Sequence, residues 1–181
     1  QNFSCPAQIK GRLKHFVSKS CMDIDGFGEK LVEQLVDNGI ISNISDIYQL
    51  TINDIQNLDR QGEKSAQNTI DSINKSKDTT LSRFIHGLGI RNVGEHASKL
   101  LERKFKKLEN IINATHDVLI EVNEIGEIMA KSIIDFFSIS ENITIINQCI
   151  KLGLIFTNPT FSITNKFAEL SFVFTGSLTK L

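Results

Sequence analysis

The stretch Ile24-Asp25-Gly26-Phe27-Gly28-Glu29 contains a tight turn, in which two glycines flank one apolar residue. Glycine adopts backbone conformations that other residues avoid, and it lets a ligand approach the backbone closely. A glutamate is favourable in the first turn of a helix, near the positive end of the helix dipole. The stretch therefore predicts a turn anchored in the core by Phe27, followed by a helix that starts at Glu29.

The Gly-Glu pair occurs four times along the chain, with spacings of 34, 32 and 32 residues. An aliphatic residue lies four positions before each glycine, and a small or modest residue lies four positions after it. The four glycines are Gly28, Gly62, Gly94 and Gly126, preceded by Ile24, Leu58, Ile90 and Val122 and followed by Val32, Ala66, Ser98 and Ala130. A period of this length marks one repeated supersecondary unit. Each copy predicts two helices joined by a short turn, with the small residue letting the helices approach closely.

Capping residues and apolar periodicity predict further helices between and after the repeats. Thr51 and Thr115 are predicted N-caps of connecting helices at 52–58 and 117–122. A further amphipathic helix is expected at 142–152, closed by Gly153. Asn158-Pro159 predicts a break, and 171–176 is typical of a buried strand that runs into a turn.

Composition and charge limit the function classes. The net charge is −1, but residues 1–107 hold 16 Lys/Arg against 13 Asp/Glu, whereas residues 108–181 hold 4 against 8. No apolar run approaches the roughly 18 residues of a membrane span, so we expect no membrane association. Cys5, Cys21 and Cys149 form no C-x-x-C pair, which favours a reducing cytoplasm and buried thiols at Cys21 and Cys149. The missing initiator Met and the C-terminal strand favour an excised fragment.

The turns are predicted to bind phosphate. Backbone N–H groups at a helix start attract anions, and such contacts position a protein on DNA without reading bases. The second turn has Arg60 and Gln61 in place of the first glycine and the apolar residue, and Arg60 could itself reach a phosphate. The candidate DNA-binding residues are Gly26, Phe27, Gly28, Lys30, Arg60, Gly62, Lys64, Arg91, Val93, Gly94 and Gly126. The alternative is a helical-repeat scaffold in which the glycines only cap helices.

The fourth turn is the weakest candidate. Glu121, Glu124 and Glu127 surround it, and carboxylates repel phosphate. A packing role is equally open there, and a side chain at Gly126 is expected chiefly to lower stability. The four histidines, His15, His86, His96 and His116, show no ligand spacing with one another or with a cysteine. We expect them to be ordinary polar or partly buried residues.

These turns, together with Cys5-Pro6-Ala7-Gln8, Gly62-Glu63-Lys64-Ser65-Ala66 and Leu88-Gly89-Ile90-Arg91, closely resemble bacterial NAD-dependent DNA ligase. The resemblance implies an all-α fold of four tandem helix-hairpin-helix motifs at 21–157. It also implies an irregular zinc-finger remnant and linker at 1–20 and the start of a truncated BRCT domain at 166–181. Cys5 matches the last of four cysteine zinc ligands, whose partners are expected upstream. Because Cys5 alone cannot hold zinc, we expect at most substoichiometric zinc in this chain.

The resemblance also implies a function. The parent enzyme uses NAD and Mg²⁺ and seals nicked double-stranded DNA during replication and repair, in the bacterial cytoplasm at the nucleoid. This chain has no K-x-D-G motif for the adenylated lysine, so it is expected to bind duplex DNA as a monomer and to be inactive alone. Two alternatives remain, a protein-interaction scaffold and the DNA-binding module of a repair nuclease.

Overall fold

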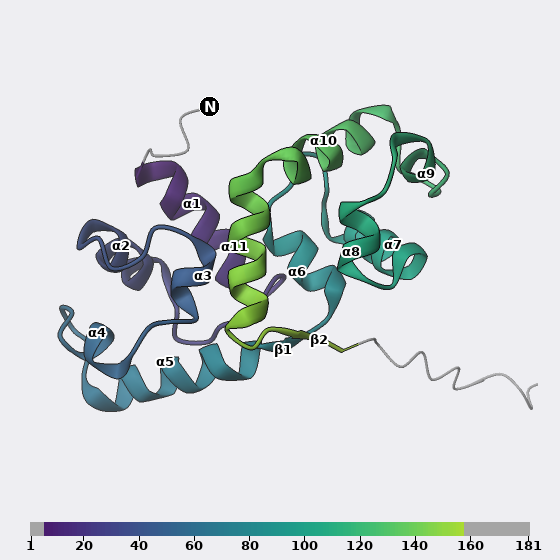
Figure 1. Ribbon diagram of the computed structural model, residues 1–181. Helices are drawn as coiled ribbons and strands as arrows, with labels where there is room; N and C mark the ends of the chain where they lie inside the picture. Colours follow the sequence, from purple (N-terminus) through teal and green to yellow (C-terminus); the bar gives the residue numbers. More distant parts are fainter. Residues whose placement is uncertain (1–5, 158–181) are drawn as a thin grey trace, which may run out of the picture.

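The computed structural model describes residues 6–157, and its regular structure is almost entirely helical (Figure 1). The elements in chain order are α1 (Pro6–Val17), α2 (Glu29–Asp37), α3 (Ile44–Ile47), α4 (Ile52–Gln56), α5 (Glu63–Ser76), β1 (Asp78–Thr79), α6 (Leu81–Gly87), α7 (Glu95–Phe105), α8 (Leu108–Ile112), α9 (His116–Ile120), α10 (Glu127–Ser138), α11 (Ser140–Lys151) and β2 (Ile155–Phe156). The all-α class is confirmed. No helix in this part of the chain is long and apolar enough to cross a membrane.

Four helical hairpins form at the predicted repeats. The helices of each hairpin pack against each other: α1 with α2, α4 with α5, α6 with α7, and α9 with α10. In every hairpin the second helix begins at the glutamate of the Gly-Glu pair. The residue four positions after each glycine is fully buried, at Val32, Ala66, Ser98 and Ala130. Small side chains at these points allow the close helix approach that the repeat predicted.

The N-terminal segment differs from expectation. Residues 1–20 were expected to be irregular, but Pro6–Val17 form α1, the first helix of the first hairpin. The reason is that Leu13, Phe16 and Val17 lie on one helix face and are buried in the core. The expected strand at 171–176, the predicted break at Asn158-Pro159, the BRCT start at 166–181 and Cys5 lie outside the described residues.

The C-terminal part of the described chain returns to the middle of the molecule. Helix α11 starts two residues before its predicted position, and Gly153 follows it with φ +100°, as a closing glycine requires. Leu154 then donates its N–H to the Cys149 carbonyl at 3.2 Å. Strand β2 pairs in parallel with β1, and this two-residue contact was not predicted.

One hydrophobic core joins the hairpins. The ring of Phe16 on α1 makes edge-to-face contacts with Tyr48, next to α3, and with Phe84 on α6, at centroid distances of 6.3 Å in both cases. Figure 1 shows α11 crossing the middle of the molecule, with α1–α5 on one side and α7–α10 on the other. The core therefore fixes the first two hairpins relative to the last two.

Candidate nucleic-acid interface

The four turns share one backbone conformation. In each of them, the residue two positions before the glycine of the Gly-Glu pair has a left-handed conformation. These residues are Gly26 (φ 78°), Arg60 (φ 60°), Asn92 (φ 63°) and Glu124 (φ 68°). The next residue donates its N–H to the carbonyl of the aliphatic residue at the start of the turn, over 3.0 to 3.3 Å. Turns one to four, defined as 24–28, 58–62, 90–94 and 122–126, are thus geometrically equivalent despite their different sequences.

The last glycine of each turn is the N-cap of the following helix. Gly28, Gly62, Gly94 and Gly126 all have extended backbones that any residue could adopt, and no side chain caps the helices that they start. By contrast, Thr51 and Thr80 accept hydrogen bonds from the N–H groups of their own helices. The first N–H groups of a helix have no intrahelical acceptor. At Gly28 and Gly126 the third N–H donates to the glycine carbonyl, and the first two N–H groups after each of the four glycines are available to an external anion.

The space in front of these glycines is open. A Cβ atom at Gly28, Gly62, Gly94 or Gly126 would meet no other atom within 4 Å. Folding therefore does not require glycine at these positions, whereas close approach of a ligand to the backbone would. The expectation that a side chain at Gly126 would chiefly lower stability is wrong, because nothing in the described structure packs against that site.

Gly26 differs from the other candidate glycines. Its φ is +78°, and a Cβ there would lie 2.9 Å from the Thr69 hydroxyl oxygen on α5. Non-glycine residues adopt this conformation in the other three turns, so the contact between turn one and Thr69 of the second hairpin is what favours glycine here.

The apolar residues of the turns hold three of them in the core. Phe27, Val93 and Ile125 are buried, whereas Gln61 in turn two is only half-buried. These side chains set the position of the turn. Because they are buried, the predicted site residues Phe27 and Val93 do not present their side chains to a ligand.

Four predicted basic residues lie on the surface beside turns one to three. Lys30, Lys64 and Arg91 are exposed, and within residues 6–157 no hydrogen bond or ion pair engages their side chains. The Arg60 side chain is 81% exposed and lies 3.8 Å from the Asp59 carboxylate. These cations are close to the free N–H groups and raise the local positive potential.

Each of the three carboxylates around the fourth turn has a lysine or histidine neighbour, and the histidines offset its charge only when protonated. The pairs are Glu121 with Lys104 at 3.7 Å, Glu124 with His96 at 3.1 Å and Glu127 with His116 at 2.8 Å. In the column of Lys30 and Lys64, this turn instead has Ile128, which is 74% exposed. Turn four therefore keeps the backbone geometry of the others but has an apolar residue in place of the cation.

The hairpins are arranged in two similar pairs. Gln34 on α2 exchanges hydrogen bonds with the backbone of Asp59 in turn two, at 2.8 and 3.3 Å. In the same way, His96 on α7 contacts turn four, and the Asn92 side-chain amide donates to Ser132 on α10 at 3.1 Å. Each pair thus brings two helix starts to adjacent positions.

Comparisons with known proteins agree with this architecture. Residues 19–75 match the family described as a SAM-like helix-hairpin-helix tandem, and residues 83–146 match the helix-hairpin-helix motif. The first match includes turns one and two but not α1, and the second includes turns three and four and ends within α11. The helix-hairpin-helix motifs predicted from the repeat are therefore confirmed.

Among curated proteins, the chain is similar to DNA ligases. It is 43% identical over 177 residues to the DNA ligase of Geobacter sulfurreducens, a match that covers 98% of this chain and 26% of that protein. It is 42% identical over 183 residues to the DNA ligase of Clostridioides difficile, covering 99% of this chain and 27% of that protein. The chain thus spans about a quarter of the length of the relatives it matches. The resemblance to DNA ligase is confirmed.

One cluster of candidate metal ligands is not predictable from spacing along the sequence. His15, Cys21 and His86 come together within the described structure, although no local spacing connects them. His15 and His86 are 71 residues apart in sequence, and only the packing of α1 against α6 makes them neighbours.

Proposed function

We propose that this chain binds double-stranded DNA without sequence preference, through backbone N–H groups at the starts of α2, α5 and α7. The observation that supports this most strongly is the open space in front of the glycine N-caps Gly28, Gly62 and Gly94. A phosphate can approach these N–H groups as it could not approach a residue with a side chain. Because the donors are backbone groups, they hold phosphate and carry no base information.

The exposed cations strengthen this proposal. Lys30, Lys64 and Arg91 lie beside three of the four helix starts, where an anion would be held by the helix dipole as well. Turn four has no such cation and presents Ile128 instead. In the proposal, therefore, turns one to three bind phosphate more strongly than turn four.

The ligase relatives suggest the setting of this binding. The proposed parent protein is an NAD-dependent DNA ligase that uses Mg²⁺ and a zinc finger, acts on nicked duplexes in replication and repair, and works in the bacterial cytoplasm. Within it, this chain would grip the duplex around the nick. The chain itself lacks the K-x-D-G lysine, so incubation with labelled NAD and nicked DNA should give no covalent AMP adduct on it.

Duplex binding can be tested by fluorescence anisotropy with two labelled duplexes of unrelated sequence at several salt concentrations. The proposal predicts equal affinities for the two, with log K falling by about 0.9 per phosphate contact for each tenfold rise in salt. Binding that does not depend on salt, or no binding at low salt, would contradict the proposal and favour a protein-interaction scaffold. Gel filtration with static light scattering tests the proposed monomeric state.

A further inference from the structure

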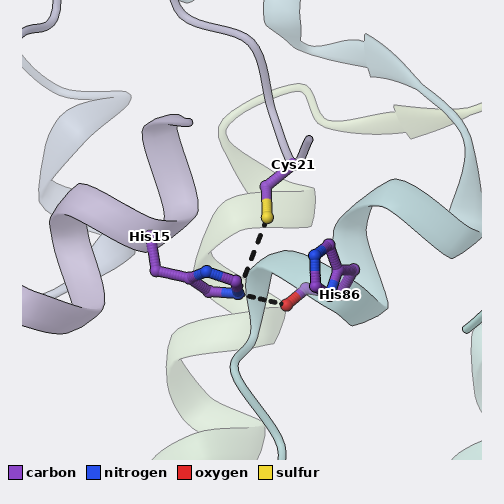
Figure 2. Close-up of side chains that lie close together, drawn as sticks. All are labelled: His15, Cys21 and His86. Atoms are coloured by element: carbon purple, nitrogen blue, oxygen red, sulfur yellow. Dashed lines mark hydrogen bonds between the residues drawn. The ribbon is translucent and has the colours of Figure 1, made fainter. Parts of the chain in front are cut away.

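His15, Cys21 and His86 form a compact group between the first and third hairpins (Figure 2). His15 lies on α1, Cys21 lies in the loop that follows it, and His86 lies in the last turn of α6. One ligand-type atom from each residue lies within 4.8 Å of the other two. Two imidazoles and a thiol are the donor types that Zn²⁺ binds most readily in proteins.

The distances within the group suit a tetrahedral ion. His15 Nε2 lies 3.6 Å from Cys21 Sγ. Zn–S and Zn–N bonds of about 2.3 and 2.1 Å, at the tetrahedral angle, place sulfur and nitrogen about 3.6 Å apart. Figure 2 shows the sulfur of Cys21 directed at this nitrogen. To complete a three-residue set, His86 has to shift its ring and His15 has to give up its hydrogen bond to the His86 carbonyl.

Hydrogen bonds within the protein leave one member of the group without a partner. His15 Nε2 is 2.7 Å from the His86 backbone carbonyl and also contacts Cys21. His86 Nδ1, however, is buried and has no hydrogen-bond partner among the described residues. A buried polar atom without a partner is costly, and a metal bond would remove that cost.

The site has room for a fourth ligand and a route for an ion. A cavity of about 440 Å³ lies beside it, and both His15 and His86 line the cavity wall. Zinc sites with three protein ligands keep their fourth position for water. A water bound there could donate to the His86 carbonyl oxygen, in place of His15.

We propose that His15, Cys21 and His86 bind one Zn²⁺ ion, which clamps the first hairpin to the third. Binding requires the Cys21 thiol to release its proton to solvent. The His15 ring changes tautomer, losing the proton on Nε2 to solvent and taking one up from solvent on Nδ1, so the net release is the thiol proton alone. This site is separate from the zinc finger that the resemblance implied through Cys5, and it does not depend on DNA binding.

Cobalt substitution tests the proposal, because Co²⁺ reports sulfur ligation directly. The reference is the whole chain with Cys5→Ser, so that Cys5 cannot contribute a thiolate. After removal of metal by a chelator, titration with Co²⁺ should give a thiolate charge-transfer band and tetrahedral visible bands that saturate at one ion per chain. Zn²⁺ should then abolish these bands and raise the melting temperature.

Variants locate the ion. Adding Cys21→Ser should remove the charge-transfer band, and adding His86→Ala should remove the tetrahedral bands and the stabilisation by Zn²⁺. Adding His96→Ala, a change at an exposed histidine, should leave both signals unchanged. Circular dichroism shows which variants fold. If Cys21→Ser does not fold, the His86→Ala variant tests the proposal in its place. Absence of the bands in the folded reference, or their persistence in a folded Cys21→Ser or His86→Ala variant, would overturn the proposal.

Discussion

His96 Nε2 lies 3.1 Å from Glu124 Oε2, and this contact joins the start of α7 to the turn of the next hairpin. A carboxylate of turn four is thereby held beside the free N–H groups of turn three. The two turns share one surface, so a charge change in one affects anion binding at the other.

The first prediction concerns Glu124. We expect Glu124→Asn to raise duplex affinity at low salt, because a carboxylate beside α7 is removed, and to have little effect at high salt, where screening is strong. Asn tolerates the φ of +68° at this position, so the free energy of unfolding should change by no more than about 0.5 kcal/mol. Asp135→Asn, an exposed change farther along α10, is the charge-matched control. Duplex affinity is measured by anisotropy titration. An equal rise in affinity for the two variants would contradict the claim that Glu124 acts through its position beside α7.

The second prediction compares two glycines that both have a positive φ but differ in the space available for a Cβ atom. Gly39 has φ +68° and open space around a Cβ, whereas Gly26 has φ +78° and would place a Cβ 2.9 Å from Thr69 Oγ1. Gly39→Ala should cost about 1 kcal/mol of unfolding free energy through backbone strain alone. Gly26→Ala should cost more, and Thr69→Ala in the same chain should recover part of the difference. Urea unfolding measures all three, and equal costs at Gly26 and Gly39 would show that the Thr69 contact does not matter.

The third prediction concerns Arg91. Its side chain is exposed and unengaged within residues 6–157, so Arg91→Ala should change stability by less than about 0.5 kcal/mol. If it contacts one phosphate, the slope of log K against log salt should become shallower by about 0.9. Affinity should fall by the same factor on every duplex sequence. A loss confined to one sequence would instead indicate base readout.

The fourth prediction concerns Cys149, which is fully buried on α11. Burial raises the pKa of its thiol to about 12, so almost no thiolate forms at pH 8. In the folded chain Cys149 should resist iodoacetamide at pH 8, and it should react once urea unfolds the protein. Peptide mass spectrometry follows this residue alone. Rapid labelling under native conditions would mean that α11 opens readily.

The repeat made much of the fold predictable. Spacing of the Gly-Glu pairs located the starts of α2, α5, α7 and α10, because a helix start has strong local signals: a glycine N-cap and an acidic first turn. The β1–β2 pair was missed because two-residue strands carry no alternating pattern. The helix α1 was missed as part of the fold because its segment was assigned to a zinc-finger remnant.

The candidate site was less predictable, because its properties depend on partners far along the chain. Sequence indicated the cations at Lys30, Lys64 and Arg91 but could not show that Glu121, Glu124 and Glu127 each have a basic neighbour. It also could not show that His15 and His86 meet beside Cys21. Such pairings arise only when hairpins pack against one another.

The most direct test of DNA binding through the backbone is the duplex affinity of Gly94→Thr. Threonine is a good N-cap, and a Cβ at Gly94 meets nothing within 4 Å, so the variant should unfold within about 0.5 kcal/mol of the unmodified chain. Its branched side chain would stand where the phosphate approaches and would compete for the same N–H groups. Gly126→Thr is the matched control, with the same open surroundings at the weakest turn. We predict that Gly94→Thr folds normally and loses most of its affinity for every duplex at moderate salt, while Gly126→Thr loses much less. A folded Gly94→Thr variant with unchanged affinity would contradict the account.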